Sequence, residues 1–96
     1  MKYDEKLVDT EFNLIIGEIL KNKRIEKGWS LLELSKKLNC KVSRQTLFHY
    51  ENGKTKIRRN IFIDLCNVYR INPDDLISEI MLKYMQHNLK DEDKEV

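Results

Sequence analysis

Residues 30–53 read SLLELSKKLNCKVSRQTLFHYENG and carry the signals of two short helices joined by a turn. Ser30, with Glu33 three positions later, has the pattern of a capping box, in which each residue accepts a hydrogen bond from the backbone of the other. A helix is therefore expected to begin after Ser30. It should end by Asn39, because asparagine tolerates the left-handed backbone that often closes a helix.

A second short helix is predicted from Ser43 to Asn52. Ser43 is the expected N-cap, and Asn52-Gly53 is a typical helix end. Two short helices separated by the tight turn Asn39–Val42 form a helix-turn-helix over about residues 30–51. In this motif, the first residues of the second helix contact the edges of DNA bases.

The flanking sequence predicts three further helices and no strand. One runs from Thr10 to Lys27, one starts at Asn60, and one starts with Asn72 as N-cap and Pro73 as the first helical residue. Gly28 should end the first of these. The fold class is therefore all-α, with five helices of which the C-terminal one is extended. The expected core residues are Phe12, Ile15, Ile16, Ile19, Leu20, Leu31, Leu34, Ser35, Leu38, Leu47, Tyr50, Ile61, Leu65, Val68 and Tyr69.

The net charge of +2 conceals a strongly uneven distribution. Residues 1–20 carry two Lys against five acids, residues 21–60 carry twelve Lys and Arg against three acids, and residues 61–96 carry four basic residues against eight acids. A basic block of this kind is typical of a surface that binds a polyanion. A solvated Lys-rich face is the common alternative, and the polar pattern within the block favours nucleic acid.

The predicted second helix places polar side chains opposite its inward residues Leu47 and Tyr50. A guanidinium can bond to both guanine O6 and N7, and a glutamine amide to adenine N6 and N7, each contributing about 1–3 kcal/mol of discrimination. Phe48 also lies off the inward face. The candidate base-reading residues are Arg44, Gln45, Thr46 and His49.

Five segments follow one another in the order of a known family: Lys23–Ser30, Glu33–Leu38, Val42–Thr46, Tyr50–Lys54 and Val68–Ile77. Through them, residues 16–77, about two-thirds of the chain, resemble the Cro/CI repressor-like (XRE) DNA-binding domain. The resemblance implies a five-helix lambda-repressor-like fold.

The resemblance implies a role for individual residues. Arg24 matches an arginine that pairs with the glutamate ending the recognition helix, here Glu51. Arg44, Gln45 and His49 match base-contacting positions. The matches to positions near the DNA backbone are Ser30, Ser43, Asn52, Lys54, Lys56 and Arg59, the last of these in the loop after the helix. Phosphate contacts position such a domain without specifying sequence.

Two features depart from the family pattern. The turn Asn39–Val42 is two residues longer than usual, which is expected to shift the angle of the recognition helix. Leu31 occupies a position where the family often has a polar residue that contacts phosphate.

The last predicted helix has a wide apolar arc that includes Ile80, Met81, Tyr84 and Met85. We expect this arc to form a homodimer interface, which would place two reading helices on a pseudo-palindromic operator. The alternative is that the helix folds back on the first helix and completes the core.

The sequence divides into an N-terminal arm (1–10), a helix-turn-helix domain (11–77), and a C-terminal helix extension with an acidic-basic tail (78–96). The predicted function is sequence-specific binding of double-stranded DNA by a transcriptional regulator, expected to be a repressor. The alternative is an antitoxin or another regulator that binds a protein partner through residues 78–96.

Other function classes have little support in the sequence. No apolar run is long enough to cross a membrane, and no secretory signal is present, so a cytoplasmic location is expected. Cys40 and Cys66 share no metal-binding spacing with each other or with a histidine, and both are expected to be free thiols. No catalytic constellation or phosphate-cradling loop is evident, so neither enzyme activity nor a cofactor is predicted. Cys40, in the turn before the second helix of the motif, is a candidate redox switch, but an inert turn thiol is the commoner case.

Overall fold

The computed structural model describes the backbone of residues 5–95 and the side chains of residues 10–87. Within residues 5–95 it contains five helices and no strand. These are α1 (Glu5–Lys27), α2 (Leu31–Lys37), α3 (Arg44–Glu51), α4 (Arg59–Tyr69) and α5 (Pro73–Glu95). The predicted all-α, five-helix fold is confirmed.

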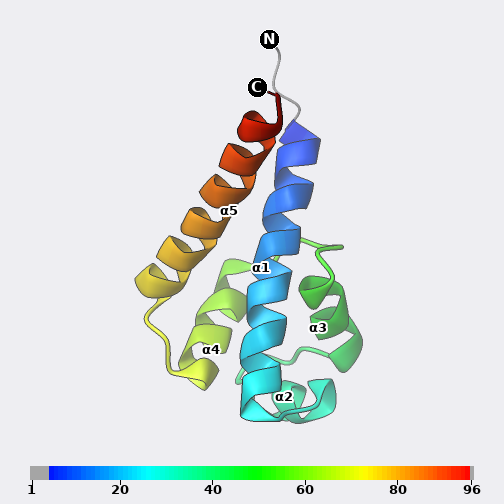
Figure 1. Cartoon of the computed structure of the whole chain (residues 1–96). Coiled ribbons are helices and arrows are strands. Elements are labelled where there is room, and N and C mark those ends of the chain that lie inside the picture. Colours follow the sequence, from blue (N-terminus) through cyan, green and yellow to red (C-terminus); the bar gives the residue numbers. More distant parts are fainter. Residues whose placement is uncertain (1–4, 96) are drawn as a thin grey trace.

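Two long helices and three shorter ones build the molecule (Figure 1). The shorter helices α2, α3 and α4 gather around the lower half of α1, while α5 runs back along its upper half. No helix in the described part of the chain is both long and apolar enough to cross a membrane.

The core lies where α1 to α4 meet the first turns of α5. Its fully buried side chains come from four of the five helices: Leu34, Leu47, Leu65, Cys66 and Leu76. Phe12, Ile15 and Ile16 on α1 are only partly buried and pack at the edge of this core. The predicted inward residues of α3, Leu47 and Tyr50, are both buried.

The expected start of the first helix at Thr10 is wrong, because α1 begins at Glu5. Residues 5–9 contain neither glycine nor proline, so nothing local prevents the helix from extending toward the N-terminus. Part of the expected N-terminal arm is therefore helical, and residues 1–4 lie outside the described residues. The proposed division after residue 77 falls inside α5.

Two further helix ends differ from expectation in how they are formed. The first helix of the motif ends at Lys37, within the predicted limit, but a left-handed Asn39 does not terminate it. The buried Leu38 follows it with an extended backbone. The fourth helix is not capped by Asn60. Its N-cap is Arg58, which makes no side-chain capping bond, and Arg59 is the first helical residue rather than part of the loop.

The start of α5 agrees with the sequence. Asn72 Oδ1 accepts a hydrogen bond from the Asp74 N–H at 2.9 Å, and Pro73 is the first helical residue. The end of α4 carries no sequence signal, because Arg70 rather than a glycine adopts the left-handed conformation (φ 57°). There the Ile71 N–H donates to the Cys66 carbonyl at 2.9 Å and closes the helix.

Candidate nucleic-acid interface

The recognition helix α3 has one buried and one exposed face. Leu47 and Tyr50 anchor it in the core, while Arg44 and Gln45 in its first turn are exposed. Since the exposed side chains stand one turn before the anchors, the helix presents its N-terminal end to the surroundings. This is the end that contacts base edges in a helix-turn-helix.

Ser43 and Thr46 use their hydroxyl groups within the protein. Ser43 Oγ accepts a hydrogen bond from the Thr46 N–H at 3.1 Å and lies 3.0 Å from Thr46 Oγ1. Ser43 is thus the N-cap of α3, as expected from the sequence. The half-buried Thr46 side chain is therefore less open to a ligand than Arg44 or Gln45.

His49 is half-buried, and its two ring nitrogens differ. Nδ1 is buried without a hydrogen-bond partner among the described residues, and the ring meets the edge of Phe48 at a centroid distance of 6.0 Å. A neutral imidazole has one donor and one acceptor nitrogen. Of these two nitrogens, Nε2 is therefore the one left to face an external partner.

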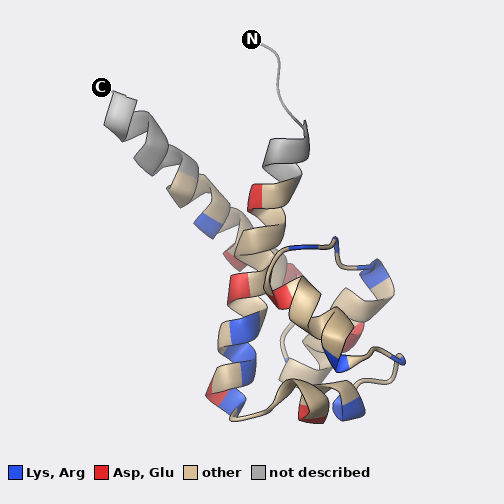
Figure 2. Ribbon diagram, turned by 90° about the vertical axis from the view of Figure 1, so that its right-hand side faces the viewer, with Lys and Arg blue, Asp and Glu red and all other residues tan. Residues whose placement is uncertain are grey.

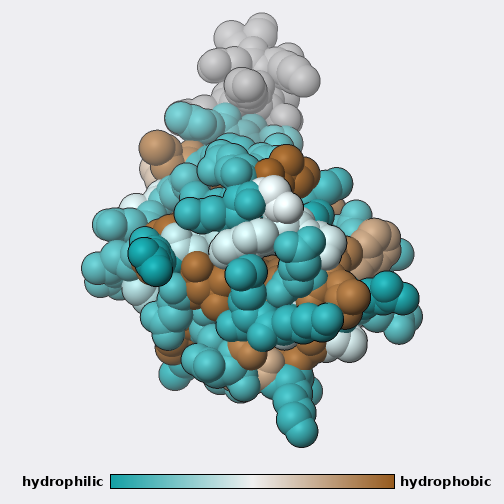
Figure 3. Space-filling view, turned by 90° about the horizontal axis from the view of Figure 1, so that it is seen from below, coloured by the Kyte–Doolittle hydropathy of each residue, from teal (hydrophilic) through white to brown (hydrophobic). Residues whose placement is uncertain are grey.

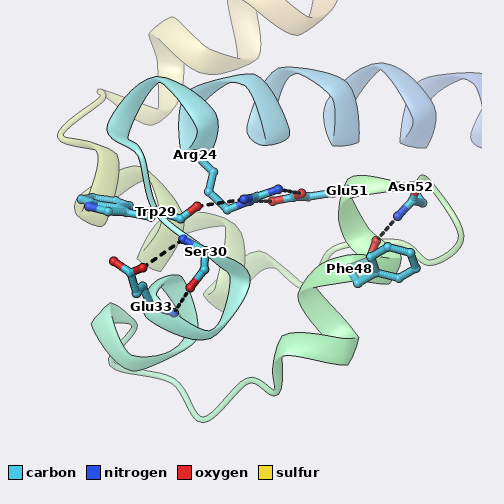
Figure 4. A network of polar contacts seen from close by, with 7 residues as sticks. All are labelled: Arg24, Trp29, Ser30, Glu33, Phe48, Glu51 and Asn52. Atoms are coloured by element: carbon cyan, nitrogen blue, oxygen red, sulfur yellow. Dashed lines mark hydrogen bonds and ion pairs between the residues drawn. The ribbon is translucent and has the colours of Figure 1, made fainter.

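The structure brings Arg24 on α1 and Glu51 at the end of α3 together as a two-pronged pair (Figure 4). Arg24 Nε donates to Glu51 Oε2 at 2.8 Å, and Nη2 donates to Oε1 at 2.9 Å. The two side chains are only 14% and 6% exposed. The hydrogen bond to Glu51 also raises the pKa of Arg24, so the guanidinium stays charged.

The third nitrogen of this guanidinium extends the contact to the α1–α2 connection. Arg24 Nη1 donates to the Trp29 carbonyl at 2.8 Å. The Trp29 ring stacks on the Tyr69 ring of α4, with the two ring centroids 5.9 Å apart. Lys37 on α2 places its Nζ 4.5 Å from the centroid of the Trp29 ring. Trp29 therefore packs against α4 as well as α2, and the arginine links the recognition helix to this junction.

Tyr69 lies beneath that junction with its hydroxyl group buried. The hydroxyl oxygen has no hydrogen-bond partner among the described residues. Burial raises the pKa of Tyr69 well above its ordinary value, and the nearby Glu51 charge adds to the shift. The phenol is therefore neutral across the physiological range.

Gly17 allows α1 and the end of α3 to lie in direct contact. A Cβ at this position would be 2.5 Å from the backbone oxygens of both Tyr50 and Glu51. Gly53, at φ +68°, plays the same part in the turn after α3, where a Cβ would meet Leu14 at 2.8 Å. For Gly17, a glycine inside a helical pattern is the sign that the sequence offers of a close backbone contact. The residues that these two glycines contact could not be named from the sequence.

The turn before α3 is fastened by a buried carboxylate that the sequence analysis did not single out. The Cys40 N–H donates to Asp64 Oδ2 at 2.8 Å, and Asp64 on α4 is only 4% exposed. Asn60 Nδ2 approaches Cys40 Sγ at 3.8 Å. The available signal was an aspartate within the otherwise apolar run Ile61–Cys66, since a buried charge needs a partner.

The same surroundings act on the thiol group of Cys40. Partial burial raises the pKa of its thiol, and the hydrogen bond and charge of Asp64 raise it further. Because the thiolate is the reactive form, these shifts disfavour the redox role considered from the sequence. The thiol of Cys66, buried in the core, also has a raised pKa from burial.

The candidate DNA-backbone residues form two groups. Lys54, Lys56 and Arg59 are exposed after α3, and Figure 2 shows the Lys and Arg positions in blue on the ribbon of the α3–α4 loop. Ser30 and Asn52 are exposed but already bonded. Ser30 forms the expected capping box with Glu33, and Asn52 Nδ2 donates to the Phe48 carbonyl at 2.7 Å.

The four residues expected at a dimer interface do not share one environment. Ile80 is 2% exposed and belongs to the core, and Tyr84 packs on Phe12 of α1 with ring centroids 5.3 Å apart. Met81 and Met85 are exposed. The inner part of the arc thus folds back on α1, as in the alternative reading of the sequence, while its outer part remains open. The side chains of residues 88–96 lie outside the described residues.

A capped helix, a turn and a second capped helix with exposed polar side chains in its first turn together define a helix-turn-helix protein. A family model described as helix-turn-helix matches residues 20–76, more than half of the chain. The chain belongs to this family, and the resemblance to the Cro/CI repressor-like domain is confirmed. Its members are DNA-binding regulators of transcription.

A solved structure shows the same fold. The crystal structure of the clp gene regulator ClgR from Corynebacterium glutamicum is similar, with a TM-score of 0.73 and 20% sequence identity over 84% of each chain. A comparison with curated protein sequences finds no match.

Proposed function

We propose that the protein binds double-stranded DNA in a sequence-specific manner and acts as a transcriptional repressor in the cytoplasm. The observation that carries the proposal is the first turn of α3, where Arg44 and Gln45 are exposed on a helix whose opposite face is buried. A short helix held in this way can enter the major groove, which is about 12 Å wide.

Arg44 and Gln45 are the principal readers in this proposal. Their planar ends suit guanine and adenine edges, and neither side chain is occupied by a hydrogen bond within the described structure. His49 adds one contact through Nε2, one turn further along α3. Thr46 contributes at most its methyl group or a hydroxyl shared with Ser43.

Backbone contacts come from exposed groups that flank the reading helix. Lys54, Lys56 and Arg59 follow α3 and supply positive charge for phosphates. We also assign phosphate contacts to Ser30, Ser43 and Asn52. Their side chains already form hydrogen bonds at the ends of α2 and α3. Because repression needs only occupancy of an operator, this arrangement is sufficient for a repressor.

Selection of bound DNA from a random pool tests the proposal, followed by binding titrations on the selected site. Arg44→Ala or Gln45→Ala should relax the preference at one base position, at a cost of about 1–3 kcal/mol each. Lys54→Ala or Lys56→Ala should weaken all sequences alike and reduce the salt dependence by about one phosphate contact.

Two results would overturn this division of labour. A pool that yields no preferred sequence contradicts sequence-specific binding altogether. Equal losses on every sequence for all four variants contradict the separation into base readers and phosphate contacts. A reporter gene placed behind the selected site checks the sign of regulation, and increased expression in the presence of the protein contradicts repression.

Homodimerisation is the second part of the proposal. Ile77, Met81 and Met85 recur every fourth residue along α5, so their exposed side chains form one apolar strip. Ile80 and Tyr84 support this strip from the inside. A dimer joined here would read two half-sites about 10 base pairs apart, or a multiple of that distance.

Sedimentation of the wild type and of Met81→Lys tests the dimer. We expect a wild-type dimer that the lysine separates, whereas Ile63→Lys, at an apolar residue of similar exposure on α4, should remain dimeric. A monomer at tens of micromolar, with and without DNA, contradicts the dimer. A wild-type monomer that forms a stable complex with a toxin through residues 78–96 would instead favour the antitoxin alternative.

A further inference from the structure

The reading face of α3 contains an apolar hollow between its polar side chains. Leu31 at the start of α2 and Phe48 on α3 line it together with Arg44 and Gln45, and it has a volume of about 340 Å³. Phe48 is 47% exposed, although its ring is large enough to fill a core position. Figure 3, which views the molecule from below, shows apolar patches that lie between hydrophilic side chains on that face.

The position of Phe48 follows from helix geometry. It lies four residues after Arg44 and three after Gln45, so the three side chains share the outer face of α3. Its ring meets His49 at 6.0 Å, and its carbonyl accepts a hydrogen bond from Asn52 at 2.7 Å. The ring is therefore presented among the proposed readers, on a backbone that is held in place.

The charge around the hollow indicates what can approach it. Exposed basic side chains surround the reading face, including Lys41 before α3 and Lys54 after it. A hydrophobic protein partner would have to lie among these charges, whereas DNA is attracted by them. In the major groove of unmodified DNA, the apolar group that base edges present is the C5-methyl of thymine.

We propose that the Leu31–Phe48 hollow binds the C5-methyl group of a thymine next to the bases read by Arg44 and Gln45. Leu31 and Phe48 then supply the apolar contacts to the methyl group. This inference rests on the proposed DNA-binding function and adds thymine to the bases that the site selects.

Replacing thymine by deoxyuridine tests the inference, since the exchange removes only the methyl group. Each thymine of the selected site is exchanged in turn, and affinities are measured for the wild type and for Phe48→Ala. At one thymine we expect an affinity loss of about fourfold for the wild type, which is the contribution of one buried methyl group. Phe48→Ala should bind both versions equally.

A matched control is Ile63→Ala, which truncates an apolar residue of 44% exposure on α4. It should retain the full preference for thymine over deoxyuridine. A third DNA arm distinguishes the sources of the methyl group: cytosine at the sensitive position should bind more weakly, and 5-methylcytosine should recover part of the loss.

Three results would overturn the inference: a selected site without thymine at the contacted positions, no loss with deoxyuridine at any position, or the same loss in the wild type and Phe48→Ala. If Phe48→Ala does not fold, the absence of any loss with deoxyuridine in the wild type still overturns the inference. Failure of DNA selection overturns the proposed function itself. A specific site without methyl dependence overturns only the role of the hollow.

Discussion

The two ends of the recognition helix are held by different physical means. At its end, Glu51 forms a charged, two-pronged pair with Arg24, and Gly17 brings the α1 backbone against the last carbonyls. At its start, the cap at Ser43 and one hydrogen bond from Cys40 to Asp64 fix the preceding turn. The C-terminal end of α3 thus depends on backbone contact and a pair of charges, whereas its N-terminal end depends on individual hydrogen bonds.

This difference gives the two ends different roles, one in the position of α3 and the other in its direction. The end of α3 is fixed against α1, one of the two longest helices, so it sets where α3 lies. The start, which carries Arg44 and Gln45, depends on a turn that is hydrogen-bonded to Asp64 of α4. Changes at the end should therefore affect the whole fold, and changes at the start should affect mainly the seating on DNA.

Removal of Glu51 should have the largest effect. Glu51→Ala leaves the Arg24 guanidinium, only 14% exposed, without its counter-charge. We expect the free energy of unfolding, measured by urea denaturation and circular dichroism, to fall by about 3–5 kcal/mol.

The matched control is Glu18→Ala. Its partner Lys83 is 3.9 Å away, and both side chains are well exposed, at 65% and 45%. Exposed pairs contribute about 0–1 kcal/mol, so this variant should be close to the wild type in stability. Equal losses in the free energy of unfolding for the two variants would show that the buried Arg24–Glu51 pair contributes no more to stability than the exposed Glu18–Lys83 pair.

Gly17→Ala comes next. Alanine favours a helix over glycine by about 0.5–1 kcal/mol, so an open site would be stabilised by the change. Here the added Cβ would meet two backbone oxygens at 2.5 Å, and backbone cannot yield as a flexible side chain does. We expect a net loss of about 2–3 kcal/mol in the free energy of unfolding.

Gly28→Ala separates crowding from backbone strain. Gly28 also has a positive φ, +74°, but a Cβ there would have no neighbour within 4 Å. Its cost should be limited to the left-handed conformation, about 1–2 kcal/mol. A stabilised Gly17→Ala protein would refute the close packing of α1 against α3.

Asp64→Ala should have a smaller and more local effect. It leaves the Cys40 N–H without its acceptor, but it also removes the unpaired, buried Asp64 Oδ1. We expect a loss of about 1 kcal/mol, at the lower limit for a stranded buried group. Amide hydrogen exchange should accelerate at Cys40 and remain unchanged in α1. Acceleration across all helices would contradict a local role.

The smallest effect concerns the Cys40 thiol. Because its pKa is raised in the folded protein, its reaction with a thiol reagent should increase with pH along a curve whose midpoint lies above the ordinary value of about 8.5. The folded state also holds this proton more tightly than the unfolded chain, so the associated stability is lost as the pH rises through the folded pKa.

Asp64→Asn sharpens this test. It keeps an oxygen that can accept from the Cys40 N–H but removes the negative charge, so the midpoint of the Cys40 curve should move to lower pH. Cys66 serves as the internal reference, because it is fully buried and should not react in the native protein. A midpoint at or below the ordinary value in the wild type would contradict the described surroundings of Cys40.

The features that sequence predicts well are local. The caps at Ser30, Ser43 and Asn72 involve partners only two or three residues away, and their patterns are readable in the chain. Arg24 and Glu51 were paired only through the family resemblance, since 27 residues separate them. The structure then supplied the geometry of that contact.

The features that sequence did not predict depend on contacts between distant segments. Gly17 and Asp64 act on backbone groups that other helices bring to them. The left-handed Arg70 and the uncapped start of α4 run against local preference, because neither residue is one that commonly occupies such a position. The division of the apolar arc on α5 likewise depends on where α1 lies, because periodicity alone does not distinguish a core face from an open one.

Trp29 is the one tryptophan of the chain, and it lies at the junction of three helices. Its ring is stacked on Tyr69, a lysine of α2 lies over it, and its carbonyl receives the arginine that holds the end of α3. The indole emission of the unmodified protein should therefore respond when this junction loosens. The molecule thus contains its own optical probe, which can report a change in the support of the reading helix without any attached label.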